Sequence, residues 1–196
     1  MAIDRRSVTR ELRLLLQGVD GLAGEGLAAA LQRVAEGATM LLRAQGAGVM
    51  LADEHEVLRC AAASGQPGRG LATAQERLGA GPALDSYRNE VPVTSRDLTA
   101  DGRWPDLRHL VDRAAVRAVL AAPLALPGGR PIGALNLHSA RARDWEVAEI
   151  AATMAYAGVV ASLISMAMEA RLRGVLLDKL LHALRATADR PDVEDG

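Results

Sequence analysis

The feature that most constrains this chain of 196 residues is a helical pattern near its C-terminal end. Asp144 is a good N-cap residue, and Glu149 lies in the first turn, where the helix dipole favours an acidic side chain. Only Gly158 and Gly174 interrupt the pattern before Arg185. The expected helix therefore has roughly forty residues, several times the usual length, and such a helix needs a helical partner.

Apolar and small residues recur along this helix at alternating spacings of four and three, which is typical of the seam of a coiled coil. The seam predicts a parallel homodimer, because after Met168 no further globular segment covers the stripe. The expected interface residues are Gly158, Ala161, Ser165, Met168, Leu172, Val175 and Leu176.

Two apolar stretches upstream of the helix predict an antiparallel strand pair. Residues 117–124 and 132–138 flank a Pro-Gly-Gly turn at residues 127–129. Because side chains alternate along a strand, Asn136 and His138 are expected side by side on one face of the second strand.

The rest of the chain divides into shorter elements. An amphipathic helix is expected over Thr9–Val19 and another over Leu27–Ala44, each with an apolar stripe. The other expected elements are strands over residues 49–52 and 57–63, a glycine-rich loop over 64–70, a short helix over 71–78, a helical turn over 84–88 and a strand over 91–93. Residues 94–114 have no clean period, and long irregular segments in compact domains tend to be functional, so a site is expected there first.

Composition narrows the functional classes. With 49% hydrophobic residues the chain can form a core, and its net charge of −1 gives no long-range attraction to nucleic acid or anionic lipid. A single cysteine, Cys60, excludes an internal disulfide and a cysteine-built zinc site. No signal peptide is evident, and no apolar stretch is expected to reach the roughly 20 residues of a bilayer span, so a cytoplasmic protein without a membrane partner is expected.

Seven short motifs follow one another between Gln75 and Ser139. In order they are Gln75-Glu76-Arg77-Leu78-Gly79-Ala80-Gly81-Pro82, Val91-Pro92-Val93, Asp97-Leu98, Asp101-Gly102-Arg103-Trp104-Pro105, residues 116–124, Gly128-Gly129 and residues 132–139. In this order and at these spacings they resemble a GAF domain, of the type at the front of bacterial GAF-ANTAR regulators.

The resemblance implies an α+β fold and a sensory or regulatory module. The expected fold is an antiparallel sheet of about five or six strands, with helices from the N- and C-terminal parts on one face and a loop and short-helix segment on the other. The expected organisation is a helical leader (1–25), the GAF domain (26–168), a helical extension (169–187) and a disordered acidic tail (188–196).

The candidate ligand pocket lies around Trp104, whose ring could line a cavity while Arg103 binds a carboxylate or phosphate. His109 could hold a haem or a metal or titrate with pH, although no close-spaced histidine pair supports a metal site. The other candidates are Asp97, Leu107, Val119 and Met50. Each of these side chains could instead be structural, Trp104 by filling the gap beneath the loop.

No catalytic residue, metal or particular cofactor is predicted, because no nucleophile is paired with a base and no phosphate-binding loop occurs. The cyclic-nucleotide signature of some GAF domains needs phenylalanine, which this chain lacks. We expect a dimeric sensor of an unidentified small molecule that acts on a downstream protein. The alternatives are a dimerisation domain without a ligand, an RNA-binding antiterminator like full GAF-ANTAR proteins, and a redox enzyme using Cys60.

Overall fold

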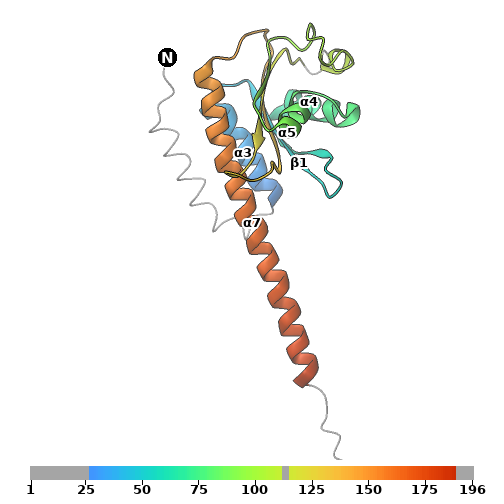
Figure 1. The fold of residues 1–196 in the computed structure, drawn as a ribbon, viewed down its shortest axis with the longest axis vertical. Coiled ribbons are helices and arrows are strands. Elements are labelled where there is room, and N and C mark those ends of the chain that lie inside the picture. Colours follow the sequence, from blue (N-terminus) through green and yellow to red (C-terminus); the bar gives the residue numbers. More distant parts are fainter. Residues whose placement is uncertain (1–26, 112–114, 189–196) are drawn as a thin grey trace, which may run out of the picture.

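The computed structural model of the chain describes residues 27–111 and 115–188, with side chains as far as Met168. It has three layers: helices α3 and α7 cover one face of a central sheet, and helices α4 and α5 cover the other (Figure 1). The expected helix over Thr9–Val19 and the expected disordered tail lie outside the described residues, as do the side chains of Leu172, Val175 and Leu176.

The elements follow the expected order with small changes of boundary. They are α3 (Leu27–Leu41), β1 (Gly46–Ala52), β2 (Leu58–Ala63), α4 (Gly65–Leu78), α5 (Pro82–Asn89), β3 (Val93–Ser95), α6 (Arg108–Val111), β4 (Ala118–Leu124), β5 (Gly133–Ser139) and α7 (Val147–Ala188). The α+β class and the packing of both terminal helices on one face are confirmed.

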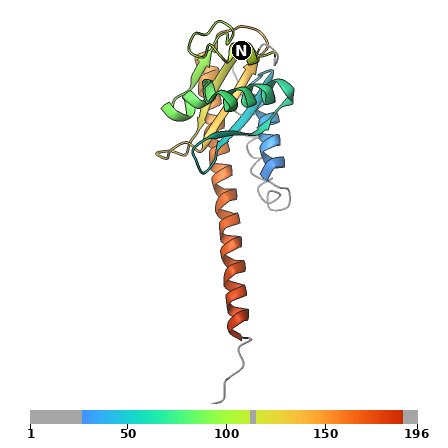
Figure 2. The ribbon, with the colours of Figure 1, turned by 90° about the vertical axis from the view of Figure 1, so that its right-hand side faces the viewer.

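The five strands pair antiparallel in the order β2-β1-β5-β4-β3, which places β5 in the middle. In this register Asn136 lies opposite Gly48 on β1 and Ala121 on β4. The next position on the same face, His138, lies opposite Gly46 and Val119. Figure 2 shows α4 and α5 crossing this face of the sheet.

The larger core lies between the sheet and helices α3 and α7. Alternate residues of β4, with Leu135 and Leu137 of β5, point into it, as the two-residue repeat of a strand requires. From α7 it receives Tyr156, Ala157, Val160, Ala161 and Ile164. This packing stabilises the first part of α7, since its apolar side is buried against the sheet.

The opposite face holds two smaller clusters. One lies under residues 94–111 and contains Trp104 and Val119, and the other lies between α4, α5 and the β1–β5 pair and contains Met50 and Ala134. The polar residues Asn136 and His138 belong to neither cluster, although both are buried.

The loop expected over residues 64–70 is wrong, because α4 already begins at Gly65. Pro67 lies in the first turn, where a helix does not need its amide hydrogen. Gly68 is buried against β1, and a Cβ atom placed on it would lie 2.9 Å from the carbonyl oxygen of Ala47. Close packing of Gly68 on the sheet, which composition does not reveal, therefore favours the helix at this position.

Two expectations about α7 also need correction. Ala161 is buried within its own chain and so is not available to a second copy, because the helix turns this residue toward the sheet. The expectation that no apolar stretch reaches membrane-spanning length is wrong, since Val147–Met168 has 22 residues, a mean hydropathy of 1.8 and 39% of its most apolar window buried. Length and composition alone are weak evidence for a span, because core helices meet the same criteria.

A buried hydrogen bond joins the two helices on this face. The hydroxyl of Tyr156 on α7 donates to the carbonyl oxygen of Val34 on α3 at 2.8 Å. We expect Tyr156→Phe to lower the free energy of unfolding by about 1 kcal/mol, because the ring still fills its site while the hydrogen bond is lost. Urea unfolding measures the difference, and an unchanged free energy would show that this bond does not stabilise the helix pair.

Candidate functional site

Trp104 fills the space under the 94–111 segment instead of lining an opening. Its side chain is 4% exposed and packs in one cluster with Leu71, Leu98, Leu107, Val116 and Val119. The indole Nε1 donates a hydrogen bond of 2.9 Å to the Asp85 carboxylate on α5. The ring therefore ties the segment to α5 and to the sheet.

The charged residues beside Trp104 are bound to protein groups. The guanidinium of Arg117 donates to the Asp97 carboxylate through Nε at 2.7 Å and also through Nη2, and Thr99 donates to it as well. The hydrogen bonds from Arg117 hold the pKa of Asp97 far below its usual value. Asp97 therefore braces the start of the segment against β4.

Arg103 is engaged in the same way. Its Nε donates to Asp101 at 3.0 Å, its Nη2 donates to the carbonyl oxygen of Thr94 at 2.5 Å, and its guanidinium lies 4.3 Å from the centre of the Trp104 ring. Hydrogen bonding from Arg103 lowers the pKa of Asp101 to about 2. The Arg103 guanidinium, which was expected to bind an anionic ligand, thus binds groups of the protein itself.

The seven predicted pocket residues do not converge on one opening. Leu107 and Val119 are buried with Trp104, Met50 is buried in the neighbouring cluster, and His109 is exposed on α6. The prediction of a hollow beneath residues 94–114 therefore needs correction, because apolar side chains occupy that space. Composition alone could not separate a packed irregular segment from a ligand-binding one.

An open cleft lies on the other side of the sheet. It has a volume of about 370 Å³ and lies between the β4–β5 connection and α7. Its lining residues are Glu90, Pro123, Ala125, Leu126, Gly128, Gly129, Arg130, Met154 and Gly158. It is apolar along the helix, and its charged residues are Glu90 and Arg130.

Three buried polar side chains lie on α4 and on the face of β5 that α4 covers. Asn136 is 2% exposed and His138 is 3% exposed on β5, and Gln75 is fully buried on α4. Among the described residues, no protein atom is hydrogen-bonded to Nδ2 or Oδ1 of Asn136, Nδ1 of His138 or Nε2 of Gln75. Buried polar atoms in native proteins are nearly always paired with protein groups or ordered water, so these atoms mark a candidate site for water or a ligand.

Glycines shape the surroundings of this group, which we call the β5 polar group (Gln75, Asn136 and His138). A Cβ atom on Gly46 would lie 2.3 Å from Cε1 of His138, and one on Gly68 would lie 3.2 Å from the same atom. Burial lowers the pKa of His138 to about 4, so this imidazole is neutral at pH 7. The sequence predicts that Asn136 and His138 share a face. The presence of two polar residues inside an apolar strand could also have indicated a candidate site.

Gln75 connects α4 to α5. Its Oε1 accepts a hydrogen bond of 2.8 Å from the backbone N–H of Ala83 in the first turn of α5. A Cβ atom on Gly81 would clash with the Gln75 side chain at 2.5 Å, and Gly81 has a φ of 141°. The motif Gln75 to Pro82 thus specifies one close junction between the two helices.

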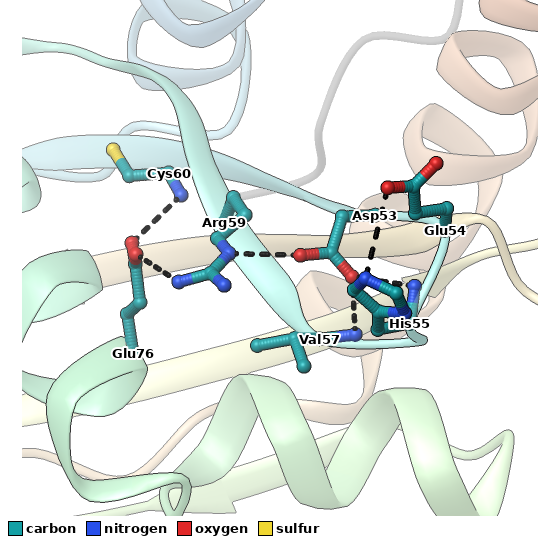
Figure 3. Close-up of polar contacts among 7 residues, drawn as sticks. All are labelled: Asp53, Glu54, His55, Val57, Arg59, Cys60 and Glu76. Atoms are coloured by element: carbon teal, nitrogen blue, oxygen red, sulfur yellow. Dashed lines mark hydrogen bonds and ion pairs between the residues drawn. The ribbon is translucent and has the colours of Figure 1, made fainter.

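Cys60 lies on edge strand β2, where an ionic chain covers the strand (Figure 3). Arg59 joins the Asp53 carboxylate, at 3.0 Å, to the Glu76 carboxylate, at 2.8 Å, and Glu76 also accepts the N–H of Cys60 at 3.4 Å. Burial raises the pKa of the Cys60 thiol, which keeps it protonated and weakly nucleophilic. The arrangement protects a sheet edge and does not activate the cysteine.

Comparison with known proteins agrees with this architecture. The family profile that matches is that of the GAF domain, over residues 24–168. This chain belongs to the GAF family. The resemblance to a GAF domain drawn from the Gln75–Ser139 motifs is thereby confirmed, whereas the GAF-ANTAR type stays a prediction. No curated protein matches the chain.

Several solved structures share the GAF fold of this chain. The GAF domain of a phosphoenolpyruvate-protein phosphotransferase from Coxiella burnetii is 20% identical, with a TM-score of 0.61 over 85% of this chain and 96% of that one. The blue-light absorbing form of the PixJ GAF domain from Thermosynechococcus elongatus is also 20% identical, with a TM-score of 0.57 over 79% and 92%. The free methionine-R-sulfoxide reductase from Neisseria meningitidis is 19% identical, with a TM-score of 0.60 over 87% and 96%.

The packing of Trp104 predicts a large loss of stability on truncation. We expect Trp104→Ala to lower the free energy of unfolding by about 3–5 kcal/mol, because the indole fills the cluster and bonds Asp85. Exposed His109→Ala, five positions along the same segment, should change it by less than about 0.5 kcal/mol. Urea unfolding measures the free energy of unfolding of both variants. Equally small changes in the two variants would mean that the ring is not part of the core.

The buried imidazole predicts a pH dependence. The folded state keeps His138 neutral down to about pH 4, whereas the unfolded chain binds the proton near the ordinary pKa of 6.5. Stability is therefore complete above pH 6.5 and decreases as the pH falls toward 4, by about 3 kcal/mol from this group. Chemical unfolding of the wild type against His138→Gln at several pH values should show this slope in the wild type only. Parallel profiles of stability against pH in the two proteins would contradict the burial of His138.

Proposed function

We propose that this chain is a regulatory, non-catalytic GAF module that binds a small molecule at the β5 polar group and signals through a homodimer of α7. The observation that carries the proposal is the position of β5 between two interiors. GAF domains are typically sensory or regulatory, which agrees with this assignment. We place the protein in the cytoplasm, with a downstream protein as its target.

Alternate residues of β5 connect the two faces of the sheet. Asn136 and His138 lie on the α4 side, and Leu135 and Leu137, which alternate with them along the strand, lie in the core that holds Tyr156 and Val160 of α7. A shift of β5 at Asn136 therefore moves side chains that touch α7. Packed cores resist continuous deformation, so a change on one face favours a discrete rearrangement on the other.

The outward side of α7 supports a contact with a second copy. Spacings of three and four connect a row of exposed or half-exposed residues that contains no charge: Val147, Ala148, Ala151, Ala155, Gly158, Ser162, Ser165 and Met166. An uncharged row of this length on a solvent-facing helix indicates an interface. Small side chains allow the backbones of two helices to approach closely, and the cleft lined by Met154 and Gly158 adjoins the row.

The length of α7 adds a second argument for the dimer. Its packing on the sheet involves residues up to Ile164, whereas the helix continues to Ala188 and projects away from the sheet as a single rod (Figure 1). A long isolated helix gains little stability from its own hydrogen bonds, so a partner helix is the simplest source of the rest. A parallel pair would bring the two projecting ends together.

The mechanism is a population shift. A ligand that prefers one position of α4 relative to β5 changes the balance between two arrangements of α7 across the dimer, by as much as its affinity differs between them. The filled cluster around Trp104 also supports a second candidate, a dimerisation module without a ligand. Ligand-dependent changes in the dimer distinguish the two.

The dimer can be tested by substitution on the outward side of α7. We expect Ala155→Glu to raise the dimer dissociation constant at least about tenfold, because a carboxylate would be buried in an apolar contact. Ending the chain after Met168 should weaken the dimer further by removing the projecting helix. Light scattering at several concentrations measures the mass.

Thr73→Glu is the matched control, since Thr73 is exposed on α4 and far from α7 in the layer order. It should leave the dimer unchanged. A monomeric wild type at micromolar concentrations, or a dimer that tolerates both the α7 substitution and the truncation, would contradict the proposed function.

A further inference from the structure

We infer that the β5 polar group recognises a small uncharged molecule that presents a hydrogen-bond donor beside an acceptor, as a carboxamide or lactam does. The inference rests on the proposed function, because it assigns the chemical class of ligand for the same site. Its contact points are the amide of Asn136, Nε2 of Gln75 and Nδ1 of His138.

The first argument is the unmet hydrogen-bonding capacity of Asn136. Both its donor Nδ2 and its acceptor Oδ1 are buried without a partner among the described residues. An amide of this kind is best matched by a group with the complementary pair, because a single acceptor or a single donor would leave one of its atoms unpaired. Gln75 supplies one more donor, since its other amide atom is already bound to Ala83.

The second argument is the absence of charge around the site. Among the described side chains, the buried polar residues are Gln75, Ser86, Ser95, Asn136, His138, Ser139 and Thr153, and none is a carboxylate, ammonium or guanidinium. Two arginines beside the Trp104 cluster, Arg103 and Arg117, are held by Asp101 and Asp97. An anion or cation bound beside Asn136 would therefore be buried without a counter-charge, which is strongly unfavourable.

The third argument concerns room and access. The cross-strand neighbours of Asn136 are small, Gly48 and Ala121. A Cβ atom on Gly48 would contact the carbonyl oxygens of Ala62 at 3.7 Å and Gly68 at 3.8 Å and the Cβ atom of Ala63 at 4.0 Å, so the floor of the site carries no bulky side chain and α4 lies directly over it.

Helix α4 covers this floor, so entry requires the helix to move outward. Glycines flank its two ends, Gly65 with a φ of 77° and Gly79 with a φ of 61°, in the left-handed region that glycine adopts readily. We place the outward movement of α4 at these two ends, with Gln75 keeping the helix joined to α5. A ligand bound to both Gln75 and Asn136 would fix the distance between α4 and β5, which links occupancy to the signal across the sheet.

Matched pairs of probes test the inference on the full chain. Nicotinamide and uracil carry an adjacent donor and acceptor without charge, and nicotinate and orotate are their anionic counterparts. At 10 mM we expect each neutral probe to raise the unfolding midpoint by about 2–4 °C and the anions to raise it by less than about 0.5 °C. The side-chain amide resonances of Asn136, in protein labelled with ¹⁵N, should shift with the neutral probes only.

Two variants test whether the probes bind beside Asn136. Asn136→Leu should abolish the response to the neutral probes, and it should also raise the midpoint of the free protein, because an unpaired buried amide is replaced by an apolar group. Thr73→Ala, on the exposed side of α4, should respond like the wild type.

Three results would overturn the inference: equal shifts with the anionic probes, no response to either neutral probe, or a response that survives in Asn136→Leu. A lower midpoint of free Asn136→Leu together with no probe response would assign the amide to ordered water only. A dimer that depends on α7 but shows no preference for uncharged probes would overturn this inference and leave the proposed function standing.

Discussion

Strand β5 lies at the centre of the sheet, and the two-residue repeat of its side chains gives its two faces opposite chemistry. Leu135 and Leu137 complete the apolar core beneath α3 and α7, while Asn136 and His138 place polar groups beneath α4. A slip of one residue would bury the polar pair in the large core and expose the leucines to α4, so the register is strongly fixed. The architecture and the proposed function both depend on this alternation.

The rest of the molecule keeps that strand in place. The 94–111 segment is braced by Asp97 on Arg117 and by Trp104 on Asp85, and the edge of β2 is covered by Glu76 and Arg59. These contacts use the charged groups that would otherwise be free to bind a ligand. The interior beneath α4 is different, because both amide atoms of Asn136, Nδ1 of His138 and Nε2 of Gln75 have no hydrogen-bond partner among the described residues. The proposed binding site therefore lies beneath α4 and not beneath the irregular segment.

Sequence patterns predicted the parts of this fold that local chemistry controls. The strand pair around Gly128, the long helix after Asp144 and the shared face of Asn136 and His138 follow from turn residues, capping and periodicity. The helical start of α4 could not be predicted, because it depends on the close approach of Gly68 to Ala47. Periodicity also located a stripe on α7 but not which side faces the sheet, so Ala161 was assigned outward although it is buried. Trp104 looked like a pocket residue because loop composition does not show what packs beneath it.

The central claim is that the Asn136 amide is buried at the middle of the sheet with no protein partner and so is free to recognise a ligand. A crystal structure of the full chain at a resolution that separates amide nitrogen from oxygen by their contacts tests it most directly. The account predicts that Nδ2 and Oδ1 of Asn136 each contact a non-protein atom, with Leu135 and Leu137 packed on α7 as described. It would be contradicted by an Asn136 amide whose nitrogen and oxygen are both bonded to backbone or side-chain groups of α4 or β1.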